Sequence, residues 1–137
     1  MPHNLKYRVV EERLAVCRLA SHAGIPAWAL EGEFFCIVRT QVELSIVCSE
    51  EVCRPDRLAD GALCERGWVA LQLEGQFPFS MTGVLASFVQ PLAAARIPIF
   101  AISTFDTDYV LIKREDVERA VEALAAAGHE RAGEEAS

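Results

Sequence analysis

The fold is decided by residues 97–113, which read IPIFAISTFDTDYVLIK. Residues 97–104 and 109–113 are mostly apolar, and the short run between them is polar and contains two aspartates. Two apolar runs of this length on either side of a short loop are typical of a β-hairpin. We therefore predict strands at residues 97–104 and 109–113.

A second hairpin of the same kind lies at residues 34–48, which read FFCIVRTQVELSIVC. In its second strand, Leu44, Ile46 and Cys48 fall on one face while the residues between them fall on the other. This alternation is typical of a half-buried strand. We predict strands at residues 34–39 and 43–48, joined by a hairpin-length connection.

The two hairpins align without a gap at an offset of 65 residues. The alignment sets Phe35 against Phe100, and Glu43 against Asp108. We interpret it as a duplicated βαββ unit whose first copy has lost most of its helix. Chance similarity between two amphipathic hairpins is the alternative.

Other elements complete each copy. Residues 14–19 and 68–73 read as the strand that opens each copy, and Pro26 can open a short helix. Ser80 is a candidate N-cap for a helix with apolar residues at helical spacing. A terminal helix at 115–127 should stop at Gly128. We expect a degenerate half at residues 1–62, a complete half at 63–128 and a polar, flexible tail at 129–137.

Composition excludes several classes of partner. The chain has 13 basic and 20 acidic residues among 137, which gives a net charge of −7. Neither nucleic acid nor an anionic membrane surface suits that balance, because both need a cluster of basic side chains. The start of the chain has no apolar leader pattern, and no segment is long and apolar enough to cross a membrane. We expect a cytoplasmic protein.

The cysteines number five, and no CxxC motif occurs. Cys48 and Cys53 form the nearest pair along the chain, and no second pair follows at zinc-ligand spacing. We interpret all five as reduced structural thiols, with metal or redox chemistry as the alternative. No metal and no cofactor is predicted.

The second half of the chain resembles a known family. The resemblance is carried by residues 79–86 (FSMTGVLA), 90–93 (QPLA) and 99–112 (IFAISTFDTDYVLI). These segments resemble the ACT-domain branch that includes the CASTOR arginine sensors and many bacterial stand-alone proteins. The resemblance implies an α+β fold of tandem ferredoxin-like βαββαβ units, with an antiparallel sheet and helices on one face. It also implies amino-acid binding between ACT units and a regulatory role.

Two segments supply the chemistry for such a site. The amides and dipole at the start of the predicted helix favour a carboxylate. The 104–108 loop offers carboxylates that can hold an ammonium group, and the resemblance assigns that role to Asp108. The simpler interpretation is a helix cap, a packing glycine and turn residues that bond their own backbone. The candidate ligand-binding residues are Ser80, Met81, Thr82, Gly83, Val84, Thr104, Phe105 and Asp108.

One position departs from the family pattern. The position matching Met81 is acidic in the arginine sensors, where it helps to recognise the guanidinium. An apolar residue there favours a smaller or more apolar amino acid.

Three classes of function compete. A regulatory module that binds a small molecule, an amino acid if the family's pattern holds, is favoured over a structural or dimerisation module without a ligand. An enzyme is disfavoured, because the sequence has no local nucleophile–base set, phosphate-binding loop or metal spacing. We expect a homo-oligomer, because ACT-like units leave sheet edges that pairing covers. We expect any regulation to act on an unidentified protein partner.

Overall fold

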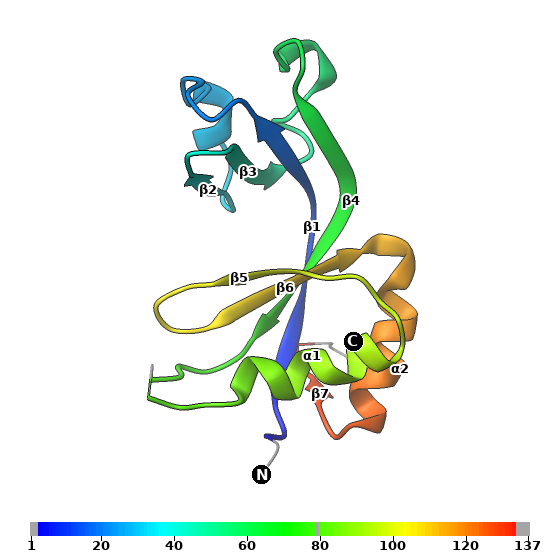
Figure 1. Cartoon of the computed structure of the whole chain (residues 1–137). Helices are drawn as coiled ribbons and strands as arrows, with labels where there is room; N and C mark the ends of the chain where they lie inside the picture. Colours follow the sequence, from blue (N-terminus) through cyan, green and yellow to red (C-terminus); the bar gives the residue numbers. More distant parts are fainter. Residues whose placement is uncertain (1–2, 79, 134–137) are drawn as a thin grey trace. The chain divides into compact units, whose positions relative to one another are not determined.

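The computed structural model describes residues 3–78 and 80–133 (Figure 1). Residues 1–2, Phe79 of the family-like segment, and residues 134–137 of the predicted tail lie outside the described residues. The chain forms two compact units. We call residues 12–68 the small unit, and residues 1–11 with 69–137 the large unit.

The small unit is a sheet with two short 3-10 helices. Its elements are the second part of β1 (Lys6–Leu19), η1 (Ala27–Leu30), β2 (Cys36–Arg39), β3 (Leu44–Ser49), η2 (Pro55–Arg57) and the first part of β4 (Leu63–Leu73). The strands lie in the order β2-β3-β1-β4. Residues 12–68 are all described and contain no α-helix. The buried residues of η1, Trp28 and Ala29, pack instead into the core of the sheet.

The large unit has two α-helices over its sheet. Its elements are the first part of β1, the second part of β4, α1 (Val84–Ala94), β5 (Phe100–Ser103), β6 (Asp108–Lys113), η3 (Arg114–Asp116), α2 (Val117–Ala126) and β7 (Glu130–Arg131). Phe88 of α1 and Leu124 of α2 share one buried cluster with Leu71 of β4 and Val110 of β6, so both helices cover the same face. No helix among the described residues is long and apolar enough to cross a membrane.

Strands β1 and β4 each run through both units, which explains their lengths of 14 and 11 residues. In the small unit the strands lie in the spatial order β2-β3-β1-β4. In the large unit they lie in the order β1-β4-β6-β5. In the small unit β4 is the edge strand beside β1, whereas in the large unit β1 lies beside β4 and pairs on its other side with β7. The predicted α+β, ferredoxin-like fold is confirmed.

The two hairpins correspond at an offset of 64 residues rather than 65. The last pair before each turn is Arg39 with Leu44 in one hairpin, and Ser103 with Asp108 in the other. The predicted equivalence of Glu43 with Asp108 is therefore wrong. The residue equivalent to Asp108 is Leu44, whose side chain is fully buried.

The turns themselves share one hydrogen-bond pattern. The amide of Thr40 donates to the carbonyl of Glu43 at 2.9 Å, and the amide of Thr104 donates to the carbonyl of Thr107 at 2.8 Å. Each threonine hydroxyl also accepts a bond from the amide three residues on, at 3.2 Å and 3.3 Å respectively. A threonine at the start of each turn therefore fixes the register.

The expectation of a flexible tail from residue 129 is corrected by the structure for residues 129–133. Gly128 has a φ of +97° and ends α2 as predicted. The buried ring of His129 follows it. Its Nδ1 accepts a bond from the amide of Leu5 at 3.1 Å, and its Nε2 lies 2.9 Å from the carbonyl of Ser87. The strand Glu130–Arg131 then pairs in parallel with β1. Residues 129–131, which look polar in sequence, are thus held in place by the buried ring of His129 and by pairing with β1.

Candidate ligand-binding site

The candidate site begins at the N-terminus of α1. Gly83 occupies the N-cap position with a φ of +78°, in the left-handed region that glycine adopts at little cost. The first intrahelical bond runs from the amide of Ser87 to the carbonyl of Gly83, at 2.9 Å. The amides of the first helical turn have no partner within a helix, so they can meet an anion.

Ser80 is not the N-cap that the sequence predicts. The helix begins three residues later than that prediction requires, at Val84. Among the described residues, no side chain caps this helix. Gly83 takes the N-cap position instead of Ser80 because it makes the sharp turn into the helix directly. The Ser80 side chain is left exposed before the turn.

Gly83 is required for its backbone conformation rather than for close approach of a ligand. A Cβ at this position would lie 3.8 Å from Nε2 of His3, at ordinary contact distance. The same ring nitrogen lies 2.9 Å from the carbonyl of Thr82. His3 therefore covers the side of Gly83 that a side chain would occupy.

The β5–β6 turn supplies the second part of the site. The hydroxyl of Thr107 donates to the carbonyl of Leu73 at 2.8 Å. The amide of Phe77 donates to the carbonyl of Asp106, also at 2.8 Å. These two bonds hold the turn against the segment that leaves β4 and leads into α1. The two bonds join residues that are 34 and 29 positions apart in the sequence, so two distant stretches are fixed side by side.

Between them lies a hollow of about 280 Å³. Six of the eight predicted residues line it: Met81, Gly83, Val84, Thr104, Phe105 and Asp108. Ser80 and Thr82 do not line it, and both are exposed. The side chains of Phe105 and Met81 are 78% and 42% exposed, which is unusual for large apolar groups beside a hollow.

Asp108 is held in place at this hollow. The hydroxyl of Ser103 donates to its Oδ1, across the pair that closes the hairpin. The carboxylate is half-buried rather than fully solvated. One oxygen is thus oriented by the protein, and the other can accept a bond from a ligand.

Several lining residues were not among the predicted ones: Phe77, Pro78, Leu85, Ala86, Ser103, Asp106 and Thr107. Strand pairing could have indicated Ser103, because it lies opposite Asp108. Nothing in the sequence indicated Phe77, which reaches the site through its bond to the carbonyl of Asp106.

Other hollows and ligand-like clusters occur. Arg18 and Asp60 line a hollow of about 340 Å³ in the small unit, which no predicted site residue reaches. Among the described residues, Cys17, Cys53 and Cys64 of the small unit form a group that could hold a metal ion.

Comparison with known proteins gives the family. A model described as ACT domain matches residues 63–126, and a second model, for an N-terminal domain, matches residues 12–57. Protein Atu0741 from Agobacterium tumefaciens is 36% identical, with a TM-score of 0.84 over 97% of this chain and 96% of its own. The chain belongs to the ACT-domain family. The hollow beside Asp108 lies wholly within the part that matches the ACT model.

Two more relatives place this ACT protein more closely. The human protein CASTOR3P is 28% identical over 96 residues, which cover 62% of this chain and 57% of CASTOR3P. The ACT protein thus spans little more than half of that relative, and it falls in the CASTOR-like branch. The ligand-free regulatory subunit of aspartate kinase from Thermus thermophilus is 14% identical, with a TM-score of 0.63 over 88% of this chain and 96% of its own, and shares the fold. Membership supports a regulatory small-molecule-binding module in general.

Proposed function

We propose that this ACT protein binds a neutral α-amino acid in the hollow between α1 and the β5–β6 turn. The observation that carries the proposal is the half-buried carboxylate of Asp108 and two exposed apolar side chains around the same hollow. Asp108, Met81 and Phe105 meet there, next to the start of a helix. The hollow, of about 280 Å³, is near the lower end of the usual range of about 300–1,000 Å³ for ligand pockets, as suits a small metabolite.

Each part of an amino acid has a partner in this arrangement. The α-carboxylate lies against the amides that open α1, where the helix dipole favours negative charge. The α-ammonium bonds to Asp108. An apolar side chain packs on Met81 and Phe105. Arginine is disfavoured, because Met81 offers its guanidinium no negative charge.

A thermal-shift screen of the full chain against the twenty amino acids tests the proposal. At a ligand concentration 100 times Kd, binding to the native state alone stabilises it by about 2.7 kcal/mol, which gives a clear rise in Tm. A neutral amino acid should give the largest rise and arginine little. If no amino acid raises the Tm at millimolar concentration, the proposal fails.

A dimerisation module without a ligand is the second candidate. It is favoured by the exposure of Phe105, which a second copy of the chain can cover as well as a ligand can. Light scattering decides whether the chain is larger than its 15.1 kDa monomer. If Phe105→Ser yields monomers and no amino acid binds to either form, the second candidate is preferred.

We further propose that the protein is a cytoplasmic homo-oligomer, that it catalyses no reaction itself and that it regulates a separate protein partner. Residues 1–62 are proposed to be a degenerate copy of residues 63–128. The shared threonine turn at an offset of 64 supports the duplication.

A further inference from the structure

Three cysteine thiols converge in the small unit, far apart in sequence. The Sγ of Cys17 lies 2.8 Å from that of Cys53 and 3.2 Å from that of Cys64. The third separation, between Cys53 and Cys64, is 3.6 Å. The first of these residues is on β1, the second follows β3 and the third opens β4. Three separate segments of the chain therefore direct a sulfur atom to one point.

A fourth thiol lies beside them. Cys48 of β3 pairs with Ala15 of β1, and Cys17 is two residues further along β1. Because side chains two residues apart point to the same face of a strand, Cys48 and Cys17 face the same way. Both are buried in one core cluster with Cys53, against which Cys64 packs.

The number of sulfur atoms favours a metal ion over a disulfide. A disulfide joins two sulfur atoms at about 2.05 Å and gives no reason for a third to share the site. Zinc bound by thiolates has bonds of about 2.3 Å, which in a tetrahedron places the sulfur atoms ~3.8 Å apart. A small outward movement from the observed 2.8–3.6 Å reaches that spacing.

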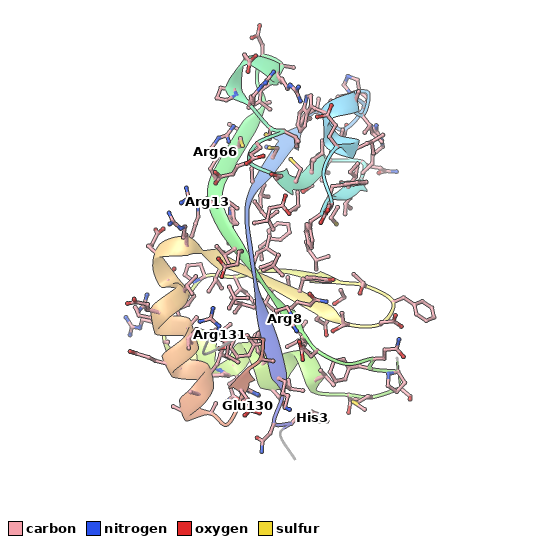
Figure 2. The ribbon with its side chains drawn as sticks, turned by 180° about the vertical axis from the view of Figure 1, so that it is seen from behind. His3, Arg8, Arg13, Arg66, Glu130 and Arg131 are labelled. Atoms are coloured by element: carbon pink, nitrogen blue, oxygen red, sulfur yellow. The ribbon has the colours of Figure 1, made fainter. Side chains whose placement is uncertain are left out.

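The surroundings offset the charge of such a site. Arg66 of β4 (labelled in Figure 2) donates to the carbonyl of Cys53 and, at 3.3 Å, to that of Glu50. One Zn²⁺ with four thiolates carries a net charge of −2, so a guanidinium at this place is favourable. Thiolate ligands select zinc and other soft ions over magnesium or calcium.

We propose that Cys17, Cys53 and Cys64 bind a zinc ion as thiolates, and that Cys48 supplies the fourth sulfur. As the metal binds, the S–H bond of each ligand breaks, a Zn–S bond forms and the proton passes to the buffer. The ion would fasten the segment after β3 to both long strands. The site shares no residue with the amino-acid site and does not depend on it.

The first test uses the full chain, reduced, stripped with a chelator and titrated with Co²⁺ alone. The expected result is one ion per chain with a thiolate-to-cobalt charge-transfer band in the near ultraviolet, lost when Zn²⁺ is added. If all five thiols are reduced and no such band develops, the proposal is overturned and the cluster is a set of packed apolar thiols. An intact mass lower by two hydrogen atoms after purification without reductant, together with no metal uptake by the reduced chain, assigns a disulfide instead.

Matched variants locate the ligands. Cys64→Ser is the variant of choice, because Cys64 is the half-buried member of the three and its replacement disturbs the core least. Zinc affinity should fall at least ~100-fold, since even loss of an outer partner costs about 10- to 100-fold. Cys36→Ser, half-buried on β2 and outside the cluster, should bind zinc as the parent does. Equal zinc affinity in Cys64→Ser and Cys36→Ser, both shown to be folded by circular dichroism, overturns the assignment.

Discussion

The hydroxyl of Ser103 donates a hydrogen bond to the carboxylate of Asp108 across the pair that closes the β5–β6 hairpin. The carboxylate is therefore oriented before any ligand binds. Binding of an ammonium group would then require little further ordering of the Asp108 side chain.

Asp108→Asn should weaken binding of the neutral amino acid that the screen identifies by about 10- to 100-fold, because a hydrogen bond to a charged group contributes roughly 1.5–3 kcal/mol. Asp106→Asn is the matched control and should cost far less, since the observed bond of Asp106 to Phe77 uses its backbone carbonyl. Calorimetry compares the two. If Asp108→Asn and the parent bind the amino acid with equal affinity, Asp108 does not contact the ligand.

Gly83→Ala should destabilise the protein by about 1–2 kcal/mol, because an L-residue is strained at a φ of +78°. Space is not the cause, since the added methyl would meet His3 only at 3.8 Å. Gly24→Ala is the control, at a position with open space around its Cβ. Urea unfolding measures both variants. A Gly83→Ala variant as stable as Gly24→Ala would mean that the turn into α1 is not strained by a side chain.

His129→Ala should destabilise the protein by about 1–3 kcal/mol for each backbone group left unpaired, here the amide of Leu5 and the carbonyl of Ser87. The exposed His22 gives the control variant His22→Ala, which should leave the urea midpoint unchanged. Amide hydrogen exchange at Leu5 should accelerate in His129→Ala alone. Unchanged exchange there would show that water replaces the ring without cost.

The metal-free protein should lose stability as the pH rises above about 9. Burial raises the pKa of Cys64 from 9.0 to about 11, with hydrogen bonding to Cys17 adding to the effect. The pKa of Cys53 is raised by burial, and that of Cys17 by hydrogen bonding to Cys48 and by burial. An unfolded thiol ionises near pH 9.0 while the native thiols stay protonated. Deprotonation therefore stabilises the unfolded state, and the free energy of unfolding falls as the pH rises.

Urea unfolding with chelator present, at about pH 8 and about pH 10, measures that loss. Zinc-loaded protein should behave in the opposite way and lose stability as the pH falls, because protons compete for its thiolates. The same pH dependence with and without zinc would contradict ligation by these thiols.

Local patterns predicted the secondary structure well, and they failed where two local signals compete. The apolar alternation around Leu44 and Ile46 identified β3, and Gly128 marked the end of α2. The start of α1 was predicted three residues too early, because Ser80 is a plausible N-cap in sequence. In the structure the left-handed Gly83 is the N-cap and turns the chain into the helix. The register of the hairpins was missed by one residue because apolar patterns match almost equally well at offsets of 64 and 65.

The candidate site was predicted in the same uneven way. The family pattern identified Asp108 and Met81, which line the hollow, but no pattern connects Phe77 to the β5–β6 turn. The cysteine cluster was missed because metal-site motifs are recognised by short spacing along the chain. Here Cys17 and Cys64 are 47 residues apart, and only strand order brings them together.

The two long strands also determine how the gene can be divided. A fragment that begins at residue 63, where the ACT match begins, keeps β4 but lacks the part of β1 that flanks β4 in the large unit. Its central strand would become a bare edge, and unpaired amides and carbonyls on such an edge recruit strands from other molecules. Expressed alone, that fragment should precipitate or exchange strands between copies. A synthetic peptide carrying residues 3–11 should restore a soluble, folded form.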